Sequence, residues 1–185
     1  MILSATAPMA SPTAAAADFP NRYFRSALGR FPTGVTIITA EHPDTHAPLG
    51  LTISSFSSVS LEPPMVLWTL THSAASRPAF LKLDRYVIHV LSASQVNLAR
   101  RFARGSHSER FAGLALGRAP NGTLMLEDPR CAAWFECCNT QHHDAGDHTI
   151  FVGQVEHCHY QPKAPLIYHA GDFELTPASE PLSRN

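Results

Sequence analysis

The sequence lacks a surplus of either charge, a long apolar run and any C-x-x-C pair. Its 14 lysines and arginines nearly balance 15 aspartates and glutamates, so a net charge of -1 attracts neither nucleic acid nor a membrane surface. No apolar run approaches the roughly 20 residues of a membrane span. The four cysteines follow no signal peptide and predict reduced thiols in a cytoplasmic protein.

Two common enzyme signatures are also absent. No G-x-S-x-G stretch supplies the nucleophile turn of an α/β-hydrolase. No G-x-G-x-x-G follows a first strand, as it would in a Rossmann dinucleotide-binding domain. The sequence therefore favours neither of these enzyme classes.

Histidine, in contrast, is abundant, with 11 residues in 185. Two segments concentrate potential metal ligands, which are His142, His143, Asp144, Asp147 and His148 in one and His157, Cys158 and His159 in the other. Adjacent histidines in a loop rarely converge on one ion, and on a strand His157 and His159 face away from Cys158. We expect no metal site, although a metal-binding interaction domain remains an alternative.

Composition divides the chain into a domain and two tails. Residues 1–18 are rich in alanine and proline and carry no charge before Asp18, which predicts a disordered tail. A single domain is expected over residues 19–177, followed by a C-terminal tail over 178–185. A domain of this length can bury a substantial core.

Apolar and β-branched runs bounded by glycine, proline or polar clusters predict a mainly β domain. Strands are expected at 35–39, 49–53, 65–70, 86–91, 132–139, 149–160 and within 165–173, and helices at 21–28, 77–83 and 95–103, the last capped by Ser94. Gly153 is expected at a bulge or a close approach. Residues 141–147 read as a polar loop, and residues 105–127 as loop-rich with Phe111 and Leu114 as anchors. Short connections between many strands indicate an antiparallel barrel with helices at its ends.

The stretch at 50–64, GLTISSFSSVSLEPP, places many hydroxyl side chains between two apolar strands. Hydroxyls and free backbone N–H groups suit an anionic, hydrogen-bond-rich ligand such as a phosphate-bearing cofactor. An ordinary serine-rich hairpin is the alternative. Ser76 and Arg77 begin the second predicted helix and are candidates for binding phosphate, against the alternative of a plain capped helix.

Four blocks together resemble the flavin reductase family with the FMN-binding split-barrel fold, the reductase components of two-component flavin-dependent monooxygenases. The blocks are RFPTGVTI at 30–37, the stretch at 50–64, GDHTIFVG at 146–153 and PLIYH at 165–169. The resemblance implies a homodimer of six-stranded antiparallel Greek-key barrels that binds FMN or FAD and uses NADH, with NADPH as a further possibility. It also implies a separate oxygenase that receives reduced flavin by diffusion.

The resemblance also assigns residues to the site. It implies that a turn and the serine-rich stretch line the flavin ring and ribityl chain through Pro32, Thr33, Gly34, Val35, Thr52, Ile53, Ser54, Ser55, Phe56, Ser57, Ser58 and Ser60. Ser76 and Arg77 would hold the phosphate, and Tyr168 would lie at the mouth of the pocket. His148 is the catalytic candidate, which the resemblance places beside the nicotinamide or the flavin ring, and a turn residue hydrogen-bonded to its own loop is the alternative. Departures are His89, where relatives often carry asparagine, and Thr71-His72, where no lysine is present.

The predicted function is that of an NAD(P)H:flavin oxidoreductase, in which hydride passes from the nicotinamide to the flavin and side chains mainly align the two rings. Two alternatives share the fold. One keeps its flavin tightly bound and reduces another substrate, and the other is a non-enzymatic flavin- or haem-binding module.

Overall fold

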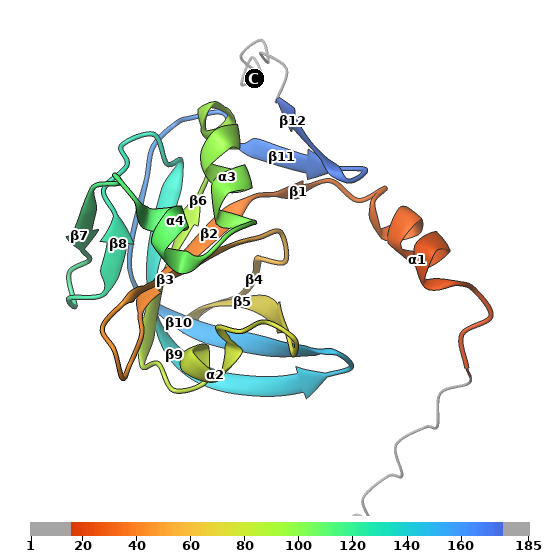
Figure 1. The fold of residues 1–185 in the computed structure, drawn as a ribbon, viewed down its shortest axis with the longest axis horizontal. Helices are drawn as coiled ribbons and strands as arrows, with labels where there is room; N and C mark the ends of the chain where they lie inside the picture. Colours follow the sequence, from red (N-terminus) through yellow and green to blue (C-terminus); the bar gives the residue numbers. More distant parts are fainter. Residues whose placement is uncertain (1–15, 176–185) are drawn as a thin grey trace, which may run out of the picture.

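The computed structural model describes residues 16–175, within which the strands form one seven-stranded antiparallel sheet and two small sheets (Figure 1). The order in the large sheet is β3-β2-β6-β9-β10-β5-β4. Its strands are β2 (Thr36–Glu41), β3 (Pro48–Ile53), β4 (Ser57–Leu61), β5 (Pro64–Thr71), β6 (Arg85–Val90), β9 (Ala133–Ala145) and β10 (His148–Tyr160). Of the predicted tails, only residues 16–18 are among those described.

The remaining elements lie around this sheet. The small sheets contain β1 (Thr33–Gly34), β11 (Leu166–His169) and β12 (Asp172–Leu175), and β7 (Leu116–Arg118) with β8 (Leu124–Leu126). The helices are α1 (Asn21–Leu28), α2 (Arg77–Phe80), α3 (Val96–Phe102) and α4 (His107–Phe111), with a 3₁₀ turn at Ala93–Gln95. In Figure 1, α1 stands away from the body of the protein.

Consecutive residues of β2 are buried, and since side chains alternate along a strand, both of its faces are covered. Ile38 and Ala40 belong to one hydrophobic cluster, whereas Ile37 belongs to a second cluster. The sheet therefore separates two cores.

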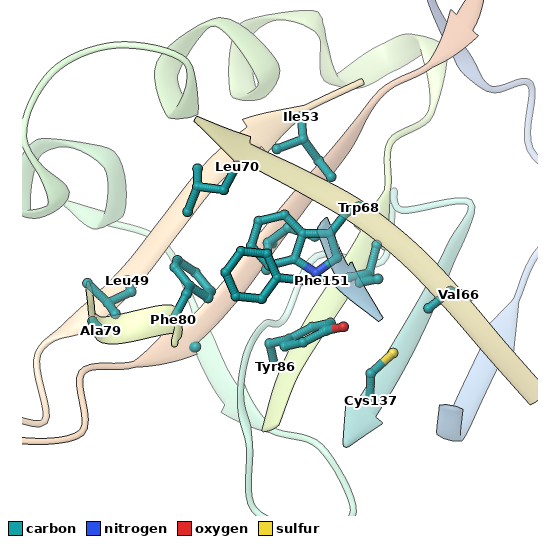
Figure 2. Close-up of a cluster of buried hydrophobic side chains, with 13 residues drawn as sticks. Leu49, Ile53, Val66, Trp68, Leu70, Ala79, Phe80, Tyr86, Cys137 and Phe151 are labelled. Carbon is teal, nitrogen blue, oxygen red and sulfur yellow. The ribbon is translucent and has the colours of Figure 1, made fainter. Parts of the chain in front are cut away.

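The first core is aromatic and lies inside the curve of the sheet (Figure 2). Leu49 on β3 and Leu70 on β5 both contribute to it, although these strands are far apart in the sheet order. The sheet must therefore curl, as a barrel requires. The rings of Trp68 and Phe151 stack with centroids 4.5 Å apart at the centre of this core.

Gly153 lies against this core, where a Cβ would overlap the phenol of Tyr86 and press on Cys137. The pairing of β9 with β10 also shifts register between Val152 and Gly153. Both parts of the expectation for Gly153, a bulge and a close approach, are confirmed.

The second core fixes α3, α4 and β11 to the other face of β2. Its buried residues include Ile37, Phe102, Phe111 and Leu166. The rings of Phe102 and Phe111 meet edge to face with centroids 4.9 Å apart. Gly50 on β3 has no room for a side chain, since a Cβ there would overlap both rings. The two helices therefore pack closely on β3, beside the serine-rich stretch.

The predicted mainly β fold with a few helices is confirmed. All the predicted strands are present, and β4 adds an edge strand within the serine-rich stretch. The loop expected at 141–147 was wrong, because residues 141–145 continue β9 and pair with 148–152 of β10, which leaves a short turn at Gly146 and Asp147.

Three local expectations also need correction. The cap before the 95–103 region is Ser92 rather than Ser94, since the Ser92 N–H donates to Gln95 Oε1 at 2.9 Å. The helix after Ser76 ends at Phe80, earlier than expected. Residues 105–127 contain α4, β7 and β8, and the anchor roles of Phe111 and Leu114 are confirmed by their places in the second core.

His89 lies away from the candidate site described below. Its side chain is fully buried on β6, where Nε2 lies 3.0 Å from Thr39 Oγ1. Burial lowers the pKa of His89 to about 3, so this imidazole is neutral in the folded protein.

Candidate functional site

The bend at residues 54–56 connects β3 to β4 and is the centre of the candidate site. Within residues 16–175, no hydrogen bond joins the backbone N–H or C=O groups of this bend to another backbone group. Ser54 is exposed, and Ser55 and Phe56 are half-buried. The bend therefore presents a row of free backbone donors and acceptors, which is what a polar, planar ligand edge requires.

Two hydroxyl side chains fix the walls beside the bend. Thr52 Oγ1 donates to the carbonyl of Ala99 on α3 at 2.7 Å, and the Thr69 N–H donates to Ser55 Oγ at 2.9 Å. These bonds connect the bend to α3 on one side and to β5 on the other. These two hydroxyls hold the shape of the site, while the backbone groups of residues 54–56 make no backbone hydrogen bond within the described residues.

A first cavity of about 630 Å³ lies between the bend, α3 and the β11–β12 hairpin. It is lined by Val35, Thr52, Ile53, Ser54, Arg100, Ala103, Arg104, Tyr168, Gly171, Asp172 and Phe173. Val35 and Tyr168, which come from the first and last sequence blocks, meet the serine-rich stretch here.

A second cavity of about 590 Å³ lies on the other side of the bend. Its lining residues come from the bend, the segment after β5, α4 and the start of β10, and include Ser55, Thr71, Ala74, Ala75, Ser76, His107, Arg110 and His148. Both cavities include Thr52, Ile53, Ser54 and Ala103. The two volumes therefore adjoin along the bend and offer places for two ligand parts.

His148 begins β10 and lines the second cavity with a side chain that is 43% exposed. Its Nδ1 lies 2.7 Å from Asp147 Oδ1. The hydrogen bond with His148 is the main reason that the pKa of the Asp147 carboxyl is lowered. The imidazole is thus held by one nitrogen while its ring borders the cavity.

The cavities bring together half of the residues predicted for the site. These are Val35, Thr52, Ile53, Ser54, Ser55, Ser76, His148 and Tyr168. The residues that line neither cavity are Pro32, Thr33, Gly34, Phe56, Ser57, Ser58, Ser60 and Arg77.

Most residues outside the cavities have other surroundings. Thr33 and Gly34 pair with Tyr168 and Ile167 of β11. Phe56 stacks on Phe135 with ring centroids 5.7 Å apart. Ser57 and Ser58 lie exposed on the edge strand β4.

Arg77 is turned away from the cavities. Its Nε donates to Thr149 Oγ1 at 2.8 Å, and its Nη2 donates to Asp144 Oδ1 at 3.0 Å. Thr149 Oγ1 also donates to Asp144 Oδ1 at 2.8 Å. Arg77 therefore ties the segment after β5 to the β9–β10 hairpin, whereas its neighbour Ser76 borders the second cavity.

Sequence reasoning missed the basic residues of the opposite wall, which are Arg100, Arg104, His107 and Arg110. Arg110 Nη1 donates to the carbonyl of Gly50 at 2.7 Å, and burial lowers its pKa. Burial likewise lowers the pKa of His107, with a further contribution from Arg110. The run LARRFARG at 98–105 carried this signal, but nothing in the sequence placed it beside the serine-rich stretch.

Among residues 16–175, no group of three or more histidine, cysteine, aspartate or glutamate side chains is arranged to hold a metal ion. His142, from the first histidine-rich segment, instead lies with Nε2 3.0 Å from Asn139 Oδ1. None of the helices in the same part of the chain is long and apolar enough to cross a membrane.

The profile of the flavin reductase like domain matches residues 28–176, which include every residue of both cavities. The chain belongs to the flavin reductase family. The resemblance drawn from the four sequence blocks is therefore confirmed.

Curated relatives in this family are similar over most of both chains. The FMN reductase (NADH) SmoA of Agrobacterium fabrum is 43% identical over 153 residues, which cover 83% of this chain and 84% of the relative. HsaB of Mycobacterium tuberculosis, the reductase subunit of a flavin-dependent monooxygenase, is 34% identical, and the aligned residues cover 85% of this chain and 83% of the relative.

Solved structures of flavin reductases have the same fold. The NADH:FAD oxidoreductase SgcE6 of Streptomyces globisporus superposes with a TM-score of 0.80 at 30% identity, covering 91% of this chain and 100% of that chain. Its structure in complex with NAD and FAD fragments gives a TM-score of 0.77 at 31% identity, covering 86% of this chain and 96% of that chain.

Proposed function

We propose that this protein is an NADH-dependent flavin reductase that transfers hydride to FMN or FAD and supplies the reduced flavin to a separate oxygenase. The similarity to SmoA, HsaB and SgcE6 supports this activity and this kind of partner. NADH is proposed as the nicotinamide because the names of SmoA and SgcE6 specify it.

The observation that carries the proposal is the pair of adjoining cavities at the bend. Each has a volume within the range of about 300–1,000 Å³ that is common for small-molecule sites. A reaction between two bound molecules needs two neighbouring volumes with a shared boundary, and Thr52, Ile53 and Ser54 form that boundary.

The residues present fit a flavin. The free backbone groups of residues 54–56 are suited to the polar edge of the flavin ring. Val35 and Tyr168 provide apolar and aromatic surface in the first cavity. Arg104 supplies positive charge there for a phosphate-bearing tail, as anion binding requires.

A bound flavin would supply the ring that accepts hydride, and the chain itself would align the reactants. We assign the residues of the bend to holding the flavin. Ser76 and His148 both line the second cavity, and we assign Ser76 to contacting a phosphate of the nicotinamide cofactor and His148 to orienting its nicotinamide. Such alignment is the main contribution a protein can make to hydride transfer between two cofactors.

We also propose that the protein acts as a homodimer. α1 has no buried residue, and it exposes Tyr23, Phe24 and Leu28 on a helix whose apolar side chains share one face. Val59 and Leu61 are likewise exposed on the edge strand β4. A second copy of the chain would cover these surfaces, and sedimentation of the purified protein tests this.

The decisive experiment measures NADH oxidation by the purified protein with and without added FMN or FAD. Turnover that depends on added flavin supports the proposal. Oxidation without added flavin would indicate a tightly bound flavin, and a coloured protein that oxidises no NADH would indicate a binding module. Repeating the assay with NADPH decides between the two nicotinamides.

The His148→Ala variant tests the role assigned to His148. We expect kcat/KM for NADH to fall about tenfold or more, because a misaligned reactant loses rate steeply, while the Kd for flavin stays unchanged. Equal loss of flavin binding and nicotinamide use, or loss of neither, would contradict the assignment.

A further inference from the structure

The turn between β9 and β10 holds the ring of His148 in one orientation. Asp147 Oδ1 lies 2.7 Å from Nδ1, whereas the structure shows no hydrogen bond to Nε2 from residues 16–175. An ionised carboxylate can only accept a hydrogen bond, and an aspartate side chain is ionised near neutral pH. The proton of a neutral His148 ring must therefore lie on Nδ1.

The turn itself is fixed by its neighbours. The backbone carbonyl of Asp147 accepts the His72 N–H at 2.8 Å and is also within reach of the Thr71 hydroxyl. One step further along the hairpin, Arg77 and Thr149 both donate to Asp144. The segment after β5 and the β9–β10 hairpin thus hold each other, so the carboxylate of Asp147 meets the imidazole in a braced turn.

A ring with its proton on Nδ1 carries a lone pair on Nε2, at the opposite edge. His148 lines the second cavity with its side chain partly exposed, so this lone pair is available to a ligand. A neutral imidazole nitrogen without hydrogen accepts a hydrogen bond but cannot donate one. The site would therefore select a ligand group that carries an N–H or O–H donor.

We infer that Asp147 is a positioning residue that fixes the tautomer of His148, and that the resulting acceptor at Nε2 binds the carboxamide N–H of the nicotinamide. The ligand named here rests on the proposed function, whereas the tautomer does not. Asp147 lines neither cavity, and its carboxylate contacts His148, so its effect on the ligand would pass through that ring.

The tautomer is tested on the protein without any ligand. Nitrogen-15 NMR of the imidazoles at about pH 9, where histidines are neutral, distinguishes the two nitrogens. The signals of His148 are assigned by their absence in His148→Gln, which removes one of 11 histidines. We expect the Nδ1–H form in the wild type and a mixture of forms in Asp147→Asn, because an amide can either accept or donate. An Nε2–H form in the wild type would overturn the inference.

Recognition of the carboxamide is tested with a substrate analogue. The reduced 3-acetylpyridine analogue of NADH replaces the amide by a methyl ketone, which accepts hydrogen bonds but donates none. The ratio of kcat/KM for NADH to that for the analogue should fall from wild type to Asp147→Asn in proportion to the loss of the Nδ1–H form, about twofold for an equal mixture. Intrinsic differences in reactivity cancel, because the same two substrates are compared in both proteins.

The matched control is Asp44→Asn, the same chemical change at an exposed carboxylate that pairs with Lys82 on another part of the surface. It should leave the ratio unchanged. An unchanged ratio in Asp147→Asn would overturn recognition of the carboxamide, even with the expected NMR result. Absence of NADH oxidation by the wild type would overturn the proposed function and the ligand together, while the NMR result would still decide the tautomer.

Discussion

The two walls that face each other across the bend hold their charged side chains in different ways. The helix wall is formed by α3 and α4, and the hairpin wall by residues 71–77 with 144–149; Figure 1 shows them on either side of β3 and β4. On the hairpin wall, the carboxylate of Asp144 pairs with the guanidinium of Arg77, and the carboxylate of Asp147 is hydrogen-bonded to His148, so this wall carries no excess of positive charge. On the helix wall, Arg101 and Arg110 instead donate to backbone carbonyls, which carry no net charge.

The difference separates two tasks. A wall whose charged side chains are held by hydrogen bonds to one another has fixed geometry, so it suits the alignment of a reacting group. A wall whose arginines bind neutral carbonyls keeps its positive charge and attracts anions into the cavity. The flavin and nicotinamide cofactors are both anionic, and both must be aligned, so a two-walled site provides attraction and alignment separately.

The largest effect is expected where the helix wall is attached to β3. Arg110 donates to the carbonyls of Gly50 and Arg104 at 2.7 Å and 3.0 Å, in a half-buried setting. Replacing it in Arg110→Met leaves those carbonyls without this donor, which we expect to lower the free energy of unfolding by about 2 kcal/mol. Urea unfolding measures it. An unchanged urea midpoint would show that packing on Gly50 alone holds α4. Arg118→Met makes the same change at an exposed site and serves as the control.

A smaller effect on binding is expected at Arg104. Its side chain lines the first cavity, and no hydrogen bond or ion pair of its guanidinium is seen within residues 16–175. Arg104→Gln should raise the Kd for FMN about fivefold at low ionic strength, and salt should reduce this difference because exposed charges are screened. Fluorescence titration of FMN measures it. A difference that is independent of salt would mean that Arg104 acts by shape rather than charge.

Arg118→Gln is the matched control for Arg104. Arg118 pairs with Glu41 and lines neither cavity. We expect its FMN affinity to equal that of the wild type at every salt concentration. A similar loss in both variants would indicate an effect of total charge and would remove the distinction between the two walls.

The sequence predicted the strands and the bend because both have local signals. Val35 and Tyr168 lie far apart in the chain, yet their sequence blocks were sufficient to place them in one site. Arg77 was assigned to phosphate because it begins a helix, but the partner that turns it away, Asp144, belongs to a hairpin that was predicted as a loop. The helix at 95–103 was predicted, but its place beside the bend, like the strand pairing of residues 141–145, depends on tertiary contacts that no local pattern records.

The smallest effect expected is a dependence of stability on acid at the base of the helix wall. Asp128 accepts hydrogen bonds from Arg130 and from Gln95 at the start of α3, and the first of these is the main cause that lowers its pKa to about 2. A carboxylate whose pKa is depressed by folding stabilises the protein above its unfolded value of about 4 and loses this contribution as the pH falls from about 4 to 2. Because solvent screens Arg130, we expect only about 1 kcal/mol. The free energy of unfolding of Asp128→Asn, measured in urea, should therefore be lower than that of the wild type at neutral pH and equal to it near pH 2. The carboxylates of the exposed hairpin wall should contribute less to stability. Curves that stay parallel down to that pH would show that Asp128 acts through shape, and that the helix wall owes nothing to this charge.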